Sequence, residues 1–217
     1  MTTLAQFYTD VSAELRRGSA FDSSIPLKAQ QAVRWLEDRH TWLHMETFNS
    51  GALDTLSAYP RRIAVPSGYK SMEFWRLLKD GDAGYRYLTK VDPKDNSRVL
   101  TEMPEGYWVS GKNYFWLDNT PDKDYSYEWK YNAYTTLPTD TAQSPQIIQD
   151  YYGILLAQTC VLFAPRLRDE KFLALHKDQR DELMKAAVDA DEEAWNTNQE
   201  LSVNYGWEYV ERVNEGA

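Results

Sequence analysis

The distribution of apolar residues predicts helices near both ends of the chain. Apolar residues recur at helical spacing over residues 3–17 and 24–45, and again over residues 144–164 and 166–200. The last of these segments is amphipathic, with charged residues outside its apolar stripe. We therefore expect two N-terminal helices and a C-terminal hairpin of two long helices.

The most apolar stretch runs from Gly153 to Ala164 and is typical of a helix buried on nearly all sides. Ser144-Pro145 favours a helix start, because a hydroxyl can cap free N–H groups and proline needs no N–H there. Pro165 is expected to stop or kink this helix. The helix over residues 24–45 is the candidate to cover it.

Strand patterns replace helical patterns in the middle of the chain. Residues 46–60 contain loop formers, and residues 61–78 allow short strands or a helical turn. Strands are expected over residues 85–89 and 107–134, with a hairpin turn at Ser110-Gly111-Lys112-Asn113. In the last strand, aromatic residues alternate with polar ones, which predicts one buried face: Tyr125, Tyr127, Trp129 and Tyr131.

The last segment, residues 201–217, lacks a clean helical pattern and alternates as a strand does. Its alternating residues are Leu201, Val203, Tyr205, Trp207 and Tyr209. A terminal segment of this kind often adds to the sheet edge of another chain. The alternatives are packing on its own domain and fraying.

Together these patterns predict an α+β protein that is mainly α. Its core is a helical bundle, formed by residues 1–58 and by the C-terminal helical hairpin 142–200. A β-rich insertion occupies residues 59–141, and residues 201–217 form an extended tail. The strand register within the insertion stays open.

Composition limits the classes of function. The net charge of −9 over 217 residues argues against tight nucleic-acid binding, which needs a basic footprint. Aromatic residues make up 14% and favour half-buried surfaces or contacts with a partner. The single Cys160 is expected to be a small core residue. We expect neither a signal peptide nor a membrane-spanning segment, and therefore a protein made and kept in a cytosol.

The motifs of common catalytic and cofactor sites are absent from the sequence. Gly106–Asn113 nearly matches a phosphate-binding loop, but its bulky residues and the strand expected after it predict a hairpin instead. His40 and His44 lie four residues apart without the glutamate of a zinc-protease helix. Asp122 with Asp124 and the acidic run 189–193 show no separation into an acid and a base. We therefore expect no enzyme activity, no metal and no cofactor.

The aromatic strand allows two interpretations. Its rings could form a stacking platform for a sugar or a single-stranded nucleic acid. Apart from Lys123 and Lys130, no cations are interleaved with its rings. We therefore favour the second interpretation, in which this face packs inside the insertion or against a neighbouring subunit.

Several motifs occur in an order that is typical of one viral family. In chain order they are Ala32–Glu37, Pro104–Tyr107, Tyr114–Asp122, an aromatic strand that ends at Tyr131, Leu137–Pro138 and Tyr151–Gln158. A long charged helix follows them. In this order and spacing, over about residues 25–200, the chain resembles the head-to-tail adaptor (connector) proteins of tailed bacteriophages.

The resemblance implies a structural virion protein without catalytic residues. Such adaptors form a ring, usually of twelve copies, below the portal, and the ring continues the DNA channel. Their helices pack side by side, the β-rich part faces the tail, and the C-terminal tail reaches the portal. This implies synthesis in the host cytoplasm, a place in the virion neck, and passive contact with the genomic DNA. The partners are the portal and the next tail or neck protein, and no membrane is involved.

Two interfaces are expected from this sequence. The portal interface is placed in the tail, at Leu201, Val203, Tyr205, Trp207, Tyr209 and Val210. The interface with the next tail component is placed at Ser110, Gly111, Lys112, Asn113, Asp118, Asn119, Asp122 and Asp124. The alternative is an aromatic β-rich binding module or hydrolase acting on a cell-wall polymer. The missing acid/base pairs and the docking-type tail favour the adaptor.

Overall fold

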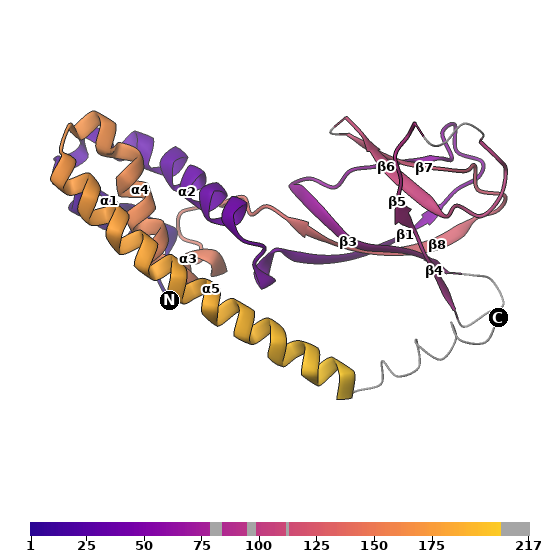
Figure 1. The fold of residues 1–217 in the computed structure, drawn as a ribbon. Helices are drawn as coiled ribbons and strands as arrows, with labels where there is room; N and C mark the ends of the chain where they lie inside the picture. The colour runs from indigo at the N-terminus through magenta and orange to yellow at the C-terminus, as the bar shows by residue number, and fades with distance from the viewer. Residues whose placement is uncertain (79–83, 95–98, 112, 205–217) are drawn as a thin grey trace. The chain divides into compact units, whose positions relative to one another are not determined.

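The chain combines helices and strands (Figure 1), so the expected mixture of α and β structure is confirmed. The computed structural model describes the backbone of residues 1–78, 84–94, 99–111 and 113–204 and, within these ranges, side chains up to residue 196.

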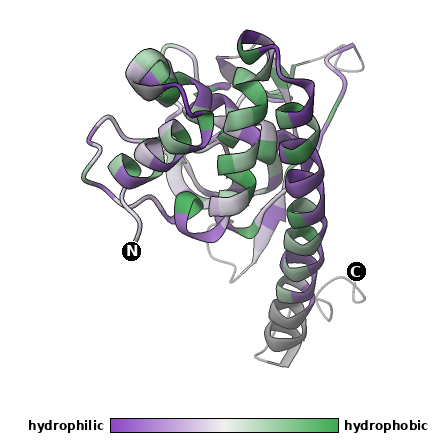
Figure 2. Cartoon of the chain, turned by 90° about the vertical axis from the view of Figure 1, so that its left-hand side faces the viewer, coloured by the Kyte–Doolittle hydropathy of each residue, from purple (hydrophilic) through white to green (hydrophobic). Residues whose placement is uncertain are grey.

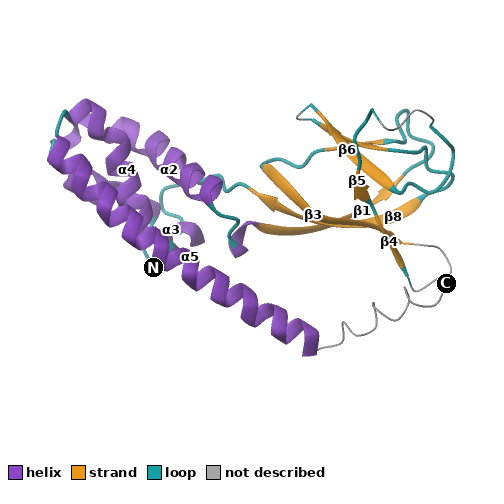
Figure 3. Ribbon diagram, viewed as in Figure 1, coloured by secondary structure: helices purple, strands orange, loops and turns teal. Residues whose placement is uncertain are grey.

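The chain divides into two compact units. Residues 1–44 together with 136–217 form one, which we call the helical unit, and residues 45–135 form the other, the β unit. Figure 3 shows that helices dominate the first and strands the second. The β unit therefore differs in both bounds from the expected insertion over residues 59–141.

The helical unit contains five α-helices and a 3-10 helix in the part that the structure describes. They are α1 (Leu4–Leu15), the 3-10 helix η1 (Gly18–Ser24), α2 (Ile25–Arg39), α3 (Gln146–Asp150), α4 (Tyr152–Leu167) and α5 (Glu170–Asn204). A second 3-10 helix, η2 (Leu43–Met45), lies where the chain leaves this unit.

The first helix ends earlier than its sequence predicts. The hydroxyl of Thr3 accepts a hydrogen bond from the N–H of Gln6, which caps the start of α1. The helix ends at Leu15, because Arg16 adopts the left-handed conformation with φ 51°. The short segment between α1 and α2 forms η1.

The buried helix is confirmed, but its ends differ from the prediction. The helix that starts after Pro145 is interrupted at Tyr151, which separates α3 from α4, and no side-chain cap comes from Ser144. Pro165 lies inside the last turn of α4, and the helix ends two residues later, with Arg168 left-handed at φ 53°. A proline near the C-terminal end of a helix removes one hydrogen bond without breaking the helical turns before it.

The C-terminal helix α5 extends beyond its predicted end at residue 200. Its last turn includes Leu201 and Val203, which were expected to begin an extended tail. Two alternating apolar residues carry little information, and without a neighbouring strand the backbone continues the hydrogen bonds of the helix. The rest of the expected tail, with Tyr205, Trp207, Tyr209 and Val210, lies outside the described residues.

Helix α4 lies at the centre of the helical unit and packs against α1, α2 and α5. The expectation that α2 covers it is thus confirmed. Aromatic rings support the packing around α4: the ring centroid of Phe7 of α1 lies 5.6 Å from that of Tyr152, and the centroid of Phe21 of η1 lies 5.3 Å from that of Phe163. Figure 2 shows apolar positions concentrated on the packed helices and mixed with polar ones along the long α5.

The β unit contains eight described strands. They are β1 (Glu46–Leu53), β2 (Arg62–Ala64), β3 (Tyr69–Leu78), β4 (Tyr85–Tyr87), β5 (Thr89–Lys90), β6 (Gly106–Ser110), β7 (Tyr114–Leu117) and β8 (Tyr125–Ala133). The prediction of a loop over residues 46–60 is wrong for the first half of this segment, which forms β1. Residues 71–78 belong to strand β3 rather than to a helical turn.

The strands form two four-stranded sheets. The first sheet has the order β1-β8-β3-β4, and the second has the order β2-β7-β6-β5. All pairs are antiparallel except β5 with β6. Gly111, at φ 65°, lies in the turn between β6 and β7, so the expected hairpin is confirmed. A phosphate-binding loop would be followed by a helix, whereas this turn is followed by strand β7.

The inner faces of the two sheets share one aromatic core. Trp75 of β3 is fully buried and lies 5.6 Å from Phe115 of β7 and 5.3 Å from Trp129 of β8, between ring centroids. Tyr125 and Tyr131 are buried in the same cluster. The aromatic face of the 125–131 strand therefore packs inside the β unit, as favoured above, and offers no open stacking platform.

Candidate functional site

The two spaced histidines bind different carboxylates rather than a common ligand. His40 Nε2 lies 3.0 Å from Oδ2 of Asp191, and His44 Nε2 lies 3.4 Å from Oε1 of Glu37. Within the described part of the chain, no group of three or more His, Cys, Asp or Glu side chains is placed to hold a metal ion. Each histidine therefore acts in a local polar pair.

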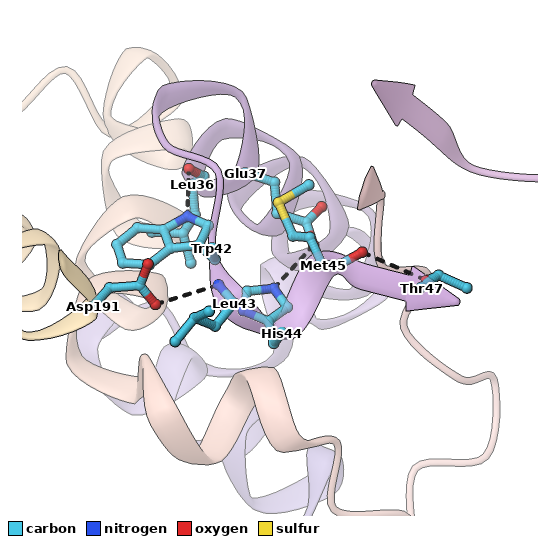
Figure 4. Close-up of polar contacts among 8 residues, drawn as sticks. All are labelled: Leu36, Glu37, Trp42, Leu43, His44, Met45, Thr47 and Asp191. Atoms are coloured by element: carbon cyan, nitrogen blue, oxygen red, sulfur yellow. Dashed lines mark hydrogen bonds and ion pairs between the residues drawn. The ribbon is translucent and has the colours of Figure 1, made fainter. Parts of the chain in front are cut away.

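Asp191 ties α5 to the segment that follows α2, and the pair of His44 with Glu37 ties that segment back to α2 (Figure 4). Asp191 of α5 accepts a hydrogen bond from the N–H of Leu43 at 3.3 Å, and Trp42 Nε1 donates to the carbonyl of Leu36 at 3.1 Å. The ring of Tyr151 lies 4.6 Å from that of Trp42, between centroids. Burial and the neighbouring charge of Asp191 raise the pKa of Tyr151, so its hydroxyl stays protonated at neutral pH.

Cys160 is a core residue, as its sequence position suggests. Its side chain is fully buried, and burial together with the charge of Glu14 raises the pKa of the thiol to about 12. A thiol of this kind is neutral at physiological pH and is a poor nucleophile.

The paired carboxylates of the β unit serve local structure. Asp122 accepts a 2.6 Å hydrogen bond from the hydroxyl of Tyr125. Asp124 accepts hydrogen bonds from the backbone N–H and the hydroxyl of Thr55, and these bonds lower the pKa of Asp124. Each carboxylate has its own partner on a different element, an arrangement that stabilises turns.

The residues expected to contact the next tail component fall into two groups at opposite ends of β7. Ser110, Gly111 and Asn113 are exposed at the β6–β7 turn, and Lys112 lies outside the described residues. At the other end, Asp122 and Asp124 are exposed, Asp118 is half-buried and Asn119 is mostly buried.

Asp118 and Asn119 hold the segment that precedes β6, residues 100–105, against the end of β7. The carboxylate of Asp118 accepts from the N–H of Glu105 at 3.1 Å, and Asn119 accepts from the N–H of Leu100 at 3.2 Å. The amide of Asn119 also donates to Glu102 at 2.9 Å. These two residues therefore have structural partners within the β unit.

The outer face of the second sheet is a surface that the sequence analysis missed. We call it the arginine–aromatic face, and it consists of Tyr59, Arg61, Arg62, Trp108, Tyr114 and Trp116. The guanidinium of Arg62 lies 3.9 Å from the ring centroid of Tyr59 and 4.2 Å from that of Tyr114. The guanidinium of Arg61 lies 5.6 Å from the ring of Trp108.

Two tryptophans complete this face. Trp108 and Trp116 are cross-strand neighbours with nearly parallel rings, at 10° and 6.5 Å between centroids, and both are half-buried. The hairpin turn contained a signal for this surface. A turn at residues 110–113 sets the pairing of β6 with β7, and alternation then directs Trp108 and Trp116 to one side.

The outer face of the first sheet is also aromatic, but its charges are paired. Phe74 lies 6.2 Å from Phe48 and 6.0 Å from Tyr87, between ring centroids. Arg76 binds Glu128 at 2.6 Å. Lys130 binds two further carboxylates, and both distances are below 3 Å: 2.7 Å to Glu46 and 2.9 Å to Glu73.

Comparison with protein-family models found no match, and comparison with curated proteins found no significant match. Among the described residues, no helix is both long enough and apolar enough to cross a membrane.

Proposed function

We propose that the chain is a head-to-tail adaptor of a tailed bacteriophage, a structural protein that forms a ring between portal and tail. In this proposal four helices from both ends of the chain form a bundle, the β-rich part is an insertion, and the C-terminal tail contacts the portal. The order and spacing of the motifs support the family. The ring is proposed to have twelve copies, to continue the DNA channel and to lie in the virion neck.

The exposure of α5 is the observation that carries the proposal. This helix is 35 residues long, and every residue from 192 to 196 is exposed. Leu175, Leu183 and Trp195 present apolar side chains to solvent along it, with Leu175 64% exposed. A long, half-covered helix of this kind gains stability when another molecule covers it. Neighbouring copies packed side by side would provide that cover.

The charge of the helical unit agrees with a DNA channel. Residues 45–135 carry 12 Lys or Arg and 13 Asp or Glu, a net charge of −1, so the remaining residues carry −8 of the total of −9. An acidic wall repels the phosphate backbone and lets DNA pass without adhering.

The test is cryo-electron microscopy of the protein bound to its cognate portal. We expect a twelve-fold ring directly below the portal, with the C-terminal segment in contact with it. A protein that occupies the tail tip, or that does not join the particle, would exclude the adaptor role.

The portal contact can be tested by shortening the chain. A variant that ends at Asn204 keeps α5 whole and removes only the residues beyond it. We expect it to retain its helical circular dichroism and to lose portal binding in a pull-down. A full-length variant with Tyr205, Trp207 and Tyr209 replaced by serine should behave in the same way. Portal binding equal to that of the wild type in both variants would contradict the proposed contact.

A polymer-binding module is the second candidate, and one observation still favours it. The rings of strand β8 are buried, but Trp108 and Trp116 remain partly accessible on the outer face of the second sheet. Binding of a cell-wall polysaccharide that disappears in a Trp108→Ala variant would support this function.

A further inference from the structure

The arginine–aromatic face has the composition of a protein interface. Trp, Tyr and Arg are the residue types most enriched where proteins bind one another, and they supply most of the binding energy there. Tyr59 is 56% exposed, and Arg62, Trp108, Tyr114 and Trp116 are each partly accessible. The rings are held in place by the sheet, so little conformational entropy is lost when a partner covers them.

The arginines of this face differ from the cations on the outer face of the first sheet, which form ion pairs with carboxylates. Arg62 lies over two phenol rings, and within the described residues no carboxylate lies at ion-pair distance from it. Arg61 donates three hydrogen bonds to the backbone carbonyls of Leu117 and Asp118, and the nearby charge of the Asp118 carboxylate partly compensates its own. Arg62 is therefore the arginine of this face that offers its charge to a partner. A cation over a ring is attracted to it but keeps its full charge. The face therefore fits an acidic partner.

The chain itself carries a surface of the opposite charge. From residue 186 to residue 204, α5 contains five acidic residues and no Lys or Arg. We call residues 186–196 the acidic segment of α5. Glu192 and Glu193 are exposed within it, and so is the indole of Trp195. Acidic and aromatic groups thus lie together on an accessible helix.

We propose that the arginine–aromatic face of one copy binds the acidic segment of α5 in a second copy. Arg62 pairs with Glu192 or Glu193, and Trp195 packs against Trp108 and Trp116. The two patches differ, so the contact is head-to-tail, the type of contact that closes into a ring when the rotation is right. This inference rests on the proposed ring and names the surfaces that form it.

Site-directed cross-linking tests the contact between copies. Cys160 is the only cysteine and is fully buried, so new thiols can be addressed selectively. One full-length variant carries Ala64→Cys, beside Tyr114 on the arginine–aromatic face, and another carries Ala194→Cys in the acidic segment. The two are mixed, assembled on the portal and treated with a short bis-maleimide. We expect a 64–194 linked peptide by mass spectrometry in the mixture.

Charge reversal shows whether the linkage depends on the proposed ion pair. Arg62→Glu in the first variant should lower the 64–194 yield about tenfold, and Glu192→Arg in the second should restore most of it. Lys123→Glu is the matched control, because it makes the same charge change at an exposed cation over Tyr125, outside this face. It should leave the yield unchanged.

Each outcome decides a separate question. A ring that forms without the 64–194 link, or with equal yield in the Arg62→Glu variant, overturns this inference and leaves the adaptor role intact. A chain that does not assemble on the portal overturns both. Quenching of tryptophan fluorescence by oligothymidylate or by a cell-wall polysaccharide, abolished by Trp108→Ala, would assign the face to that polymer and also overturn the inference.

Discussion

The two compact units build their interiors from different side chains. The core of the helical unit is largely aliphatic, with Leu4, Val33, Leu36 and Leu155 fully buried. It also encloses polar groups, among them Glu37. The core of the β unit is largely aromatic and is centred on Trp75, Phe115 and Trp129. Aliphatic side chains interlock between helices, whereas large rings fill the wider space between two sheets.

The units also differ in charge, which suggests a division of tasks. The helical unit carries −8 of the net charge, and the β unit is close to neutral. In the proposed ring the acidic unit repels DNA, and the near-neutral unit offers aromatic surface to protein partners. Substitutions in each core test whether the two interiors are as distinct as they look.

The largest effect is expected for charges placed in the centre of the helical unit. Ile154→Asp with Leu155→Asp puts two unpaired carboxylates into α4, where the exposed fractions are 4% and 0%. Each buried charge costs several kcal/mol, against a total stability of about 5–15 kcal/mol. We expect loss of the helical circular dichroism. Leu175→Asp, at a 64% exposed position of α5, is the control and should fold. A soluble, helical double variant would show that α4 is not the core.

A smaller loss is expected from the aromatic core of the β unit. Trp75 is fully buried and its ring contacts those of Tyr107, Phe115, Tyr127 and Trp129. Trp75→Ala should lower the free energy of unfolding by about 3–5 kcal/mol in urea titrations.

Trp108→Ala is the matched control for Trp75→Ala. It removes the same side chain from the outer face of the second sheet, where its main neighbour is Trp116. The cost should be about 1 kcal/mol, the size of a cross-strand pair. Equal losses in the two variants would show that the outer tryptophan is as much a core residue as the inner one.

The difference between the units also explains which parts of the fold the sequence could predict. Apolar periodicity predicts the helices correctly, although the observed ends at Leu15 and Asn204 differ from the predicted ends by a few residues. Strand β1 does not follow, because Asn49, Ser50 and Gly51 are typical of a loop. Gly51 stands opposite Tyr127, and a Cβ there would lie 2.4 Å from the phenol oxygen. The glycine therefore lets an aromatic ring lie across the strand, a tertiary contact that local propensity does not contain.

The candidate surface was missed for a similar reason. Alternation of aromatic and polar residues is clearest on β8, but alternation does not say which face of a strand is covered. In the short β6 and β7, the rings that point outward are Trp108 and Trp116, and Arg62 joins them from a strand about 50 residues earlier. Only the pairing of β2 with β7 brings these residues together.

The smallest effect concerns a titratable group that the aliphatic interior encloses. His176 of α5 is 4% exposed and lies 4.2 Å from the ring of Phe172. Burial lowers the pKa of His176 below its ordinary value, and the charge of Glu14 only partly opposes this. The unfolded chain therefore binds the proton more readily, and stability should fall as pH drops below about 6.5. In a His176→Leu variant this component is absent. The free energy of unfolding of both proteins is measured by urea titration from pH 7.5 to 5. The value for the wild type, relative to that of the variant, should decrease as pH falls. A difference that is constant with pH would show that the histidine accepts its proton in the folded state as easily as in water.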